Sequence, residues 1–248
     1  MIKIRGVCKS CGSHEALKHI NLDVVGGETL AIIGGSGSGK STLLRLLIGL
    51  DRPTSGEIYI MGSPIANMSE KQLDELRMHM GMVFQYSALF DSMTVGENVA
   101  FGLREHTDYS DEKIRSIVAE KLEQVGLPGI EASMPGELSG GMKKRVGLAR
   151  AIAFNPKIIF YDEPSSGLDP IMTAKIDELI VDTQKKQKAT SVVVTHDMAS
   201  ACTIADRIAM IYEGELIAVE NVENFQKLED PRVQSFLQRM HVGREARK

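Results

Sequence analysis

The stretch GGSGSGKST, residues 34–42, constrains the fold of this chain more than any other feature. It fits the pattern G-x-x-x-x-G-K-[ST], and it follows an apolar segment, TLAIIG, that predicts a strand and precedes a predicted helix from about Lys40. Glycines let the backbone curl until successive amides face one anion, and the helix N-terminus adds its positive end. We therefore interpret the stretch as a phosphate loop, with a chance glycine-rich turn as the alternative.

Within this loop, two residues have distinct expected roles. Lys40 is expected to reach the β and γ phosphates of a nucleotide, and the hydroxyl of Ser41 is expected to bind Mg²⁺. The residues predicted to hold the phosphates are Gly34, Ser36, Gly37, Ser38, Gly39, Lys40, Ser41 and Thr42.

Strand-like and helix-like segments alternate along the rest of the chain. KIIFYDE precedes a predicted helix from about Pro170, and TSVVVTH precedes one from about Met198. Apolar runs such as IIF and VVV suit strands that are covered on both faces, as in a parallel sheet. The chain is therefore predicted to be α/β, and INLDVVGGE and EIYIMG add a small antiparallel part.

Residues 69–151 are richer in helix than the flanking regions. Ser69 and Gln72 form a candidate capping box, and an apolar helical face further along the chain stops at Gly126. That face consists of Ile114, Ile117, Val118, Leu122 and Val125. We predict a core formed by residues 1–86 and 152–225, an inserted helical subdomain at 87–151, and a terminal helix and tail at 226–248.

Composition limits the class of protein. A formal net charge of −4 in 248 residues gives no basic footprint for nucleic acid, which is not an expected partner. No apolar run is long enough to span a bilayer and the N-terminus lacks a signal-peptide core, so a cytosolic location is expected. Three cysteines fit a reducing compartment; CKSC, with Cys8 and Cys11, could form a redox pair or half a zinc site, but strand-end thiols are the preferred interpretation.

Two carboxylates end the predicted strand IIFYDE, at the edge where α/β sheets place their ligands. Asp162 suits a metal ion, and Glu163 could face the attacking water as a general base or polarising group. A pair of solvated loop acids is the alternative.

A second glycine-containing loop, LSGGM, opens a further predicted helix. Ser139, Gly140 and Gly141 offer a hydroxyl and amides at a helix start. Lys143, Lys144 and Arg145 follow, and cations in a first helical turn oppose the helix dipole unless an anion lies nearby. A solvated basic turn remains the other interpretation of these three side chains.

Five features stand in a fixed order: GGSGSGKST, Gln85 in MVFQ, LSGGM, YDEPSSGLDP and His196 in VVVTHD. This set resembles the nucleotide-binding subunit of an ABC transporter over Ile2 to about Val222. The resemblance implies a RecA-like P-loop NTPase fold, ATP and Mg²⁺ as ligands, ATP hydrolysis, and a homodimer in which LSGGM completes the site of the partner subunit. One chain would then need two loops that meet phosphate.

The resemblance also implies roles for individual residues. Gln85 would reach Mg²⁺ or the attacking water, although it could be an exposed strand-end glutamine. His196 would contact the γ phosphate, although a strand-end histidine could be a satisfied polar residue. Asp169 would lie at the dimer seam, although SGLD could form a helix-capping turn before Pro170.

Two residues depart from the family pattern. Met142 stands where the family usually has glutamine, which should spare the contacts of Ser139, Gly140 and Gly141. The aromatic residue that typically stacks on adenine falls near Cys11, and VCKSCGSHEAL contains no aromatic ring. Stacking of about 1 kcal/mol would be missing there. The stem of Lys9 or thiol contact could hold the base instead, and nucleotide preference could be relaxed.

FQYSALFDSMTVGENVAFGLREHT, LSGGM and DPRVQSFL resemble the ATPase of Mla/Mce-type phospholipid transporters more narrowly. This implies an MlaE-like transmembrane permease, an MCE-domain lipid-binding protein, and attachment to the cytoplasmic face of the inner membrane through the permease. Alternatives are an amino acid or lipoprotein transporter and a non-transport ABC ATPase; a P-loop kinase or small GTPase has no use for LSGGM.

The C-terminal segment has its own pattern. Asp230 is expected to cap a helix that starts with Pro231, and Val233, Phe236, Leu237 and Met240 share one face. That face is expected to pack either on this chain or on a partner subunit.

Overall fold

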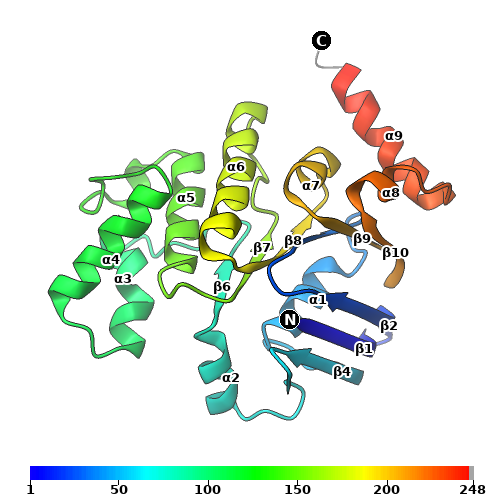
Figure 1. Ribbon diagram of the computed structural model, residues 1–248, viewed down its shortest axis with the longest axis horizontal. Helices are drawn as coiled ribbons and strands as arrows, with labels where there is room; N and C mark the ends of the chain where they lie inside the picture. The colour runs from blue at the N-terminus through cyan, green and yellow to red at the C-terminus, as the bar shows by residue number, and fades with distance from the viewer. Residues whose placement is uncertain (246–248) are drawn as a thin grey trace. The chain divides into compact units, whose positions relative to one another are not determined.

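The computed structural model describes residues 1–245 and groups them into two compact units (Figure 1). The first unit contains Met1–Arg77 and the segment from Thr190 onward, and the second contains Met78–Ala189. The subdomain boundaries expected from the sequence stay a prediction.

The antiparallel sheet of the first unit has the strand order β2-β1-β4-β5. Its strands are β1 (Ile2–Cys11), β2 (His14–Val24), β4 (Ser55–Ile60) and β5 (Ser63–Pro64). Along β1, Ile2 and Ile4 are buried while Lys3 and Arg5 are exposed, so one face of the sheet packs and the other meets solvent. This is the small antiparallel part that the sequence predicts.

The other strands of the first unit follow the order β10-β9-β3-β8. They are β3 (Thr29–Ile33), β8 (Thr190–Thr195), β9 (Arg207–Tyr212) and β10 (Glu215–Asn221). β3 pairs in parallel with both β8 and β9, and every residue of β3 and β8 is buried. The apolar runs of these two strands therefore have the environment that the sequence predicts.

Helices follow the two fully buried strands β3 and β8 of this unit. α1 (Lys40–Leu47) follows the phosphate loop, and α7 (Met198–Ile204) follows β8, both beginning at the predicted residues. α2 (Glu70–Arg77) begins with the predicted capping box: the Ser69 amide donates to Gln72 Oε1 at 2.9 Å, and the Gln72 amide donates to Ser69 Oγ at 3.4 Å.

The C-terminal helices pack on their own chain. α8 (Val222–Gln226) precedes α9 (Pro231–Glu245), and Asp230 Oδ1 accepts the Arg232 amide at 2.8 Å as the predicted cap. Val233 and Leu237 are buried in one cluster with Phe225 and Met198. The first two turns of α9 therefore dock on this chain itself; the side chain of Met240 lies outside the described part.

The second unit combines a parallel strand pair with helices (Figure 1). Its elements are β6 (Met80–Val83), α3 (Val95–His106), α4 (Asp111–Gln124), the 3₁₀ turn η1 (Pro135–Glu137), α5 (Gly140–Ala151), β7 (Ile158–Asp162) and α6 (Pro170–Gln187). Helices α3, α4 and α5 pack against one another, and α5 also lies against β6. Ile114, Val118 and Leu122 of α4 are buried, as their spacing predicts.

Candidate functional site

The phosphate loop is shaped by two close approaches of the backbone. A Cβ on Gly34 would lie 2.2 Å from the carbonyl oxygen of Ile211, and one on Gly39 would lie 2.6 Å from that of Ala16. Gly39 also has a φ of 108°, which glycine adopts without strain. β2 and the β9–β10 hairpin therefore back the loop, and glycine is required at both positions.

The start of α1 provides donors for an anion. Its N-cap is Gly39, without a side-chain cap, and its first turn contains no acidic residue. The Lys40 ammonium is buried and donates to the carbonyl oxygens of Gly34 at 2.8 Å and Gly35 at 2.9 Å. Amides at an uncapped helix start, with a lysine held over the loop, fit a nucleotide phosphate.

His196 lies at the same edge of the sheet as the phosphate loop. Ile33 of β3 is the register partner of Thr195 in β8, and the loop and His196 follow these two residues. The side chain of His196 is exposed, and Asp197 caps α7 by accepting the amides of Ala199 and Ser200. The structure thus brings these two predicted features together within the first unit.

Gln85 and the two carboxylates share an edge in the second unit. Val83 of β6 is the register partner of Tyr161 in β7, so Gln85, which follows β6, and Asp162, which ends β7, lie at the same edge of these neighbouring strands. Gln85 Nε2 donates to Ser166 Oγ at 3.4 Å. Glu163 has a φ of 47°, a left-handed conformation that costs an ordinary residue about 1–2 kcal/mol. Such strain is often found at functional sites.

Lys144 connects these two segments. Its ammonium donates to the carbonyl oxygen of Gln85 and, at 3.4 Å, to that of Glu163. Burial lowers the pKa of the Lys144 ammonium, and the carboxylates of Glu163 and Asp162 act on that pKa in the opposite direction. The sequence singled out Lys144 as a cation that needs an anion nearby, and the anions that influence it here are carboxylates of its own chain.

Ser139 begins α5 and remains accessible. Its Oγ accepts the Met142 amide at 3.3 Å, and both Ser139 and Gly140 are exposed. A Cβ on Gly141 would lie 2.3 Å from Cε of Met172, so glycine lets α5 pack closely on α6. An exposed hydroxyl at a helix N-terminus can meet an anion from outside the chain.

Asp169 acts as the N-cap of α6. Its Oδ1 accepts the amides of Ile171 at 2.9 Å and Met172 at 3.0 Å, and Pro170 is the first helical residue. This is the capping turn that the sequence offered as one interpretation. Because Asp169 is exposed, the capping bonds leave its proposed role at a dimer seam open to test.

The region where the family aromatic is missing contains small and charged side chains. Cys11 is exposed, and the Lys9 ammonium donates to the carbonyl oxygen of Arg52 at 2.8 Å. Cys8 is buried, and its sulfur accepts the His19 amide at 3.3 Å. All three cysteines are free thiols, and no cluster of three or more His, Cys, Asp or Glu residues suited to a metal occurs in residues 1–245.

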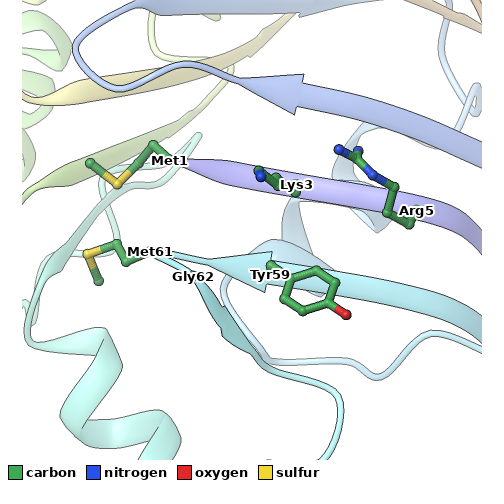
Figure 2. Close-up of a pocket in the computed structure, with 6 residues that line it drawn as sticks. All are labelled: Met1, Lys3, Arg5, Tyr59, Met61 and Gly62. Carbon is green, nitrogen blue, oxygen red and sulfur yellow. The ribbon is translucent and has the colours of Figure 1, made fainter.

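A separate hollow lies on the antiparallel sheet (Figure 2). Lys3 and Arg5 of β1 and Tyr59 of β4 line it together with Met1, Met61 and Gly62. Arg5 is already bound there, because its guanidinium forms an ion pair with Asp23 at 2.6 Å. The lining includes no residue of the predicted site.

The chain is similar to known ATP-binding proteins over most of its length. A model of the ABC transporter family matches residues 17–166. The chain is 44% identical to the probable ribonucleotide transport ATP-binding protein mkl of Mycobacterium leprae, over 98% of this chain and 70% of that protein. It is 43% identical to the intermembrane phospholipid transport system ATP-binding protein MlaF of Haemophilus influenzae, over 96% and 90%.

Two further similarities concern cargo and assembly. The chain is 47% identical to the methionine import ATP-binding protein MetN of Carboxydothermus hydrogenoformans, over 82% of this chain and 60% of that protein. A dimeric, post-hydrolysis structure of the ATP-binding cassette MJ0796 with ADP and phosphate superposes with a TM-score of 0.82 at 36% identity, covering 90% of this chain and 99% of that one. In the described residues, no helix is both long and apolar enough to cross a membrane.

Proposed function

The chain belongs to the ABC transporter family as an ATP-binding, ATP-hydrolysing subunit, and we propose that the cargo of its transporter is phospholipid. The similarity to MlaF carries this proposal, because it extends over 96% of this chain and 90% of that protein. The similarity to MetN extends over only 82% of this chain and 60% of that protein. A phospholipid transporter therefore accounts for more of the chain than a methionine importer does.

In the proposed mechanism, the phosphate loop and Lys40 bind the triphosphate, and His196 contacts the γ phosphate. Glu163 polarises the attacking water and takes up its proton at a carboxylate oxygen. Ser41, Gln85 and Asp162 would hold Mg²⁺, which when bound neutralises charge on the phosphate oxygens. The uncapped amides at the start of α1 suit the phosphates. Hydroxyl, amide and carboxylate oxygens are ligands that suit Mg²⁺.

The site is completed by a second copy of the chain. Ser139, Gly140 and Gly141 of one subunit would cover the far side of the ATP held by the other, and Asp169 would lie at the seam between them. The exposed hydroxyl of Ser139 at the start of α5 supports this arrangement. The dimeric assembly of the MJ0796 cassette supports it as well.

A permease is the proposed membrane partner, of the MlaE type, together with an MCE-domain protein that holds lipid. Exposed aromatic side chains around the loop after β6 suit such docking: Tyr86 is 86% exposed, and Phe90 and Phe101 form a tilted pair with 4.9 Å between ring centroids. Attachment to the cytoplasmic face of the inner membrane would follow from this partner.

The test uses the complex that copurifies with the tagged chain from membranes. Reconstituted into liposomes with a labelled phospholipid, the wild-type complex is expected to transfer lipid only with ATP. Lys40→Ala should abolish both nucleotide binding and transfer, because the loop loses its cation. Lys71→Ala, which removes an exposed lysine of α2, is the matched control and should leave both unchanged.

The same vesicles can be offered methionine or a ribonucleotide. Transfer of lipid that does not depend on ATP, or that survives Lys40→Ala, would contradict the proposal. ATP-dependent uptake of either small solute without lipid transfer would show that this solute, and not phospholipid, is the cargo.

A further inference from the structure

α5 holds the loop that follows β6 through three positions on one of its faces. The Lys144 ammonium donates to the carbonyl oxygen of Gln85, and the Arg150 guanidinium donates to those of Ser87 and Ala88, both at 2.7 Å. Gly147 lies between them, where a Cβ would meet Cβ of Ser87 at 3.4 Å. The spacing of three residues places all three positions on the same side of the helix.

Lys144 differs from Arg150 in what it connects. Only Lys144 also donates to the carbonyl oxygen of Glu163, at 3.4 Å, so one ammonium reaches the main chain beside both the glutamine and the carboxylate. The Glu163 carbonyl also accepts the Ser166 amide at 3.1 Å, and Ser166 Oγ accepts from Gln85 Nε2. Gln85, Lys144, Glu163 and Ser166 thus form one continuous hydrogen-bonded network.

The backbone at these acceptors is strained. Glu163, Ser87 and Ala88 have φ values of 47°, 62° and 46°, all in the left-handed region. A non-glycine residue persists in this region where its surroundings hold it there. Side chains of α5 donate hydrogen bonds to the carbonyl oxygens of these three residues and to that of Gln85. The helix therefore stabilises the local backbone that carries the proposed catalytic groups.

A lysine at this position is costly. The residue is only 7% exposed, and it lies just beyond the first turn of α5. Burying an ammonium is unfavourable unless its hydrogen bonds are made. An apolar side chain of similar length would avoid this cost, so the hydrogen bonds to Gln85 and Glu163 are the contribution that is specific to lysine.

We propose that Lys144 is a positioning residue for ATP hydrolysis, whose ammonium fixes the main chain at Gln85 and Glu163 relative to α5. This inference rests on the proposed function, because Gln85 and Glu163 are the residues given roles at the phosphate there. Ser139 is the N-cap of the same helix. Lys144 therefore also fixes Gln85 and Glu163 relative to the Ser139 hydroxyl, which is proposed to contact the ATP held by the partner subunit.

The experiment measures steady-state ATP hydrolysis by the purified transporter complex that contains the full chain. Lys144→Met keeps the length of the side chain and removes its donors. We expect kcat to fall about 100-fold, the effect of an ångström-scale misplacement, with the KM for ATP within about threefold because the phosphate loop is unchanged. Lys144→Arg, which can still donate to both carbonyls, should recover at least about tenfold of the lost kcat.

Lys121 provides the matched control. It is a second buried lysine of the same unit, 2% exposed, and its ammonium donates to Asn155 Oδ1 at 2.7 Å and Glu120 Oε1 at 3.0 Å. Lys121→Met should lower the thermal midpoint and leave kcat within about threefold of wild type. A merely structural role for Lys144 predicts the same result for both methionine variants.

Three results would overturn the role of Lys144: a kcat of Lys144→Met within threefold of wild type, an equal loss of kcat in Lys121→Met, or no recovery by Lys144→Arg. If Lys144→Met does not fold, Lys144→Gln replaces it in the experiment. The shorter side-chain amide of glutamine reaches one carbonyl only. About a tenfold loss of kcat in Lys144→Gln therefore supports the role, and an unchanged kcat refutes it. Failure of the proposed site is distinct: wild-type turnover would then survive Glu163→Gln.

Discussion

The carboxylate of Glu163 projects from a backbone in the left-handed region, with a φ of 47°. Glutamine has the same shape and the same backbone preferences, so Glu163→Gln changes charge and basicity without adding strain. The variant should keep its nucleotide affinity and lose hydrolysis by about 100-fold or more, since a general base contributes 10²–10⁴-fold.

An ATP-loaded dimer is therefore the expected product of Glu163→Gln, with light scattering in the presence of ATP as the measurement. Glu178→Gln, at an exposed position on α6, is the control and should turn over ATP like wild type. Adding Lys40→Ala to Glu163→Gln should prevent dimerisation, because nucleotide binding is lost. A Glu163→Gln chain that stays monomeric at saturating ATP in the assembled complex would contradict the role of this residue.

At the scale of elements, two helices hold the loop after β6. α5 contacts the beginning of this loop, and α3 contacts its end. Asn98 is fully buried: its Nδ2 donates to the carbonyl oxygens of Phe90, Met93 and Thr94, and its Oδ1 accepts the Phe90 amide at 2.8 Å. These four hydrogen bonds of Asn98 all go to residues 90–94. The loop that carries Gln85 and Tyr86 is thus fastened near its beginning by α5 and near its end by α3.

Asn98→Leu should destabilise the chain, because it leaves buried loop groups without partners. Each unsatisfied group costs about 1–3 kcal/mol, so we expect the free energy of unfolding to fall by about 3 kcal/mol. Urea denaturation measures this difference, with Asn224→Leu, at an exposed position of α8, expected to stay within about 0.5 kcal/mol of wild type. A loss below 1 kcal/mol for Asn98→Leu would show that the loop does not depend on this side chain.

Local sequence patterns predicted the elements whose signals are confined to a few neighbouring residues. The phosphate loop follows a buried strand, α2 has its Ser69–Gln72 capping box, and α6 begins at Pro170. The same patterns could not predict the hydrogen bonds of Lys144 and Arg150 to Gln85, Ser87 and Ala88, because these residues lie 59 to 63 positions away in sequence. In α5, buried positions include Lys144 and Gly147 as well as apolar residues, so hydrophobic periodicity gave no indication of this face.

The register of the parallel strands explains which residues of the candidate site could be predicted from the sequence to lie close together. Once a parallel sheet is predicted, residues that follow its strands are expected at one edge, and His196 with the phosphate loop and Gln85 with Asp162 fulfil this within their units. Asp169 shows the limit of this reasoning, since a capping carboxylate and a seam carboxylate have the same sequence pattern. The roles proposed for these residues stay predictions.

At the scale of the whole molecule, each chain has one complete phosphate loop and one serine–glycine helix start. In a two-fold symmetric dimer, each proposed site takes its phosphate loop from one subunit and Ser139 from the other. Two variants that are inactive alone should then complement each other when mixed. Lys40→Ala disables the loop, and Ser139→Asp puts a negative charge beside the phosphates while aspartate still caps α5.

In a mixed dimer of these variants, one site contains both defects and the other contains neither. Random pairing at equal amounts makes half of the dimers mixed, so we expect about a quarter of wild-type ATP hydrolysis. The matched control mixes Lys40→Ala with Glu163→Gln: the proposal puts these residues in the same site, so every site of the mixed dimer has one defect and activity should stay at background. Background activity in the first mixture, or recovery in the second, would contradict a site shared between two subunits.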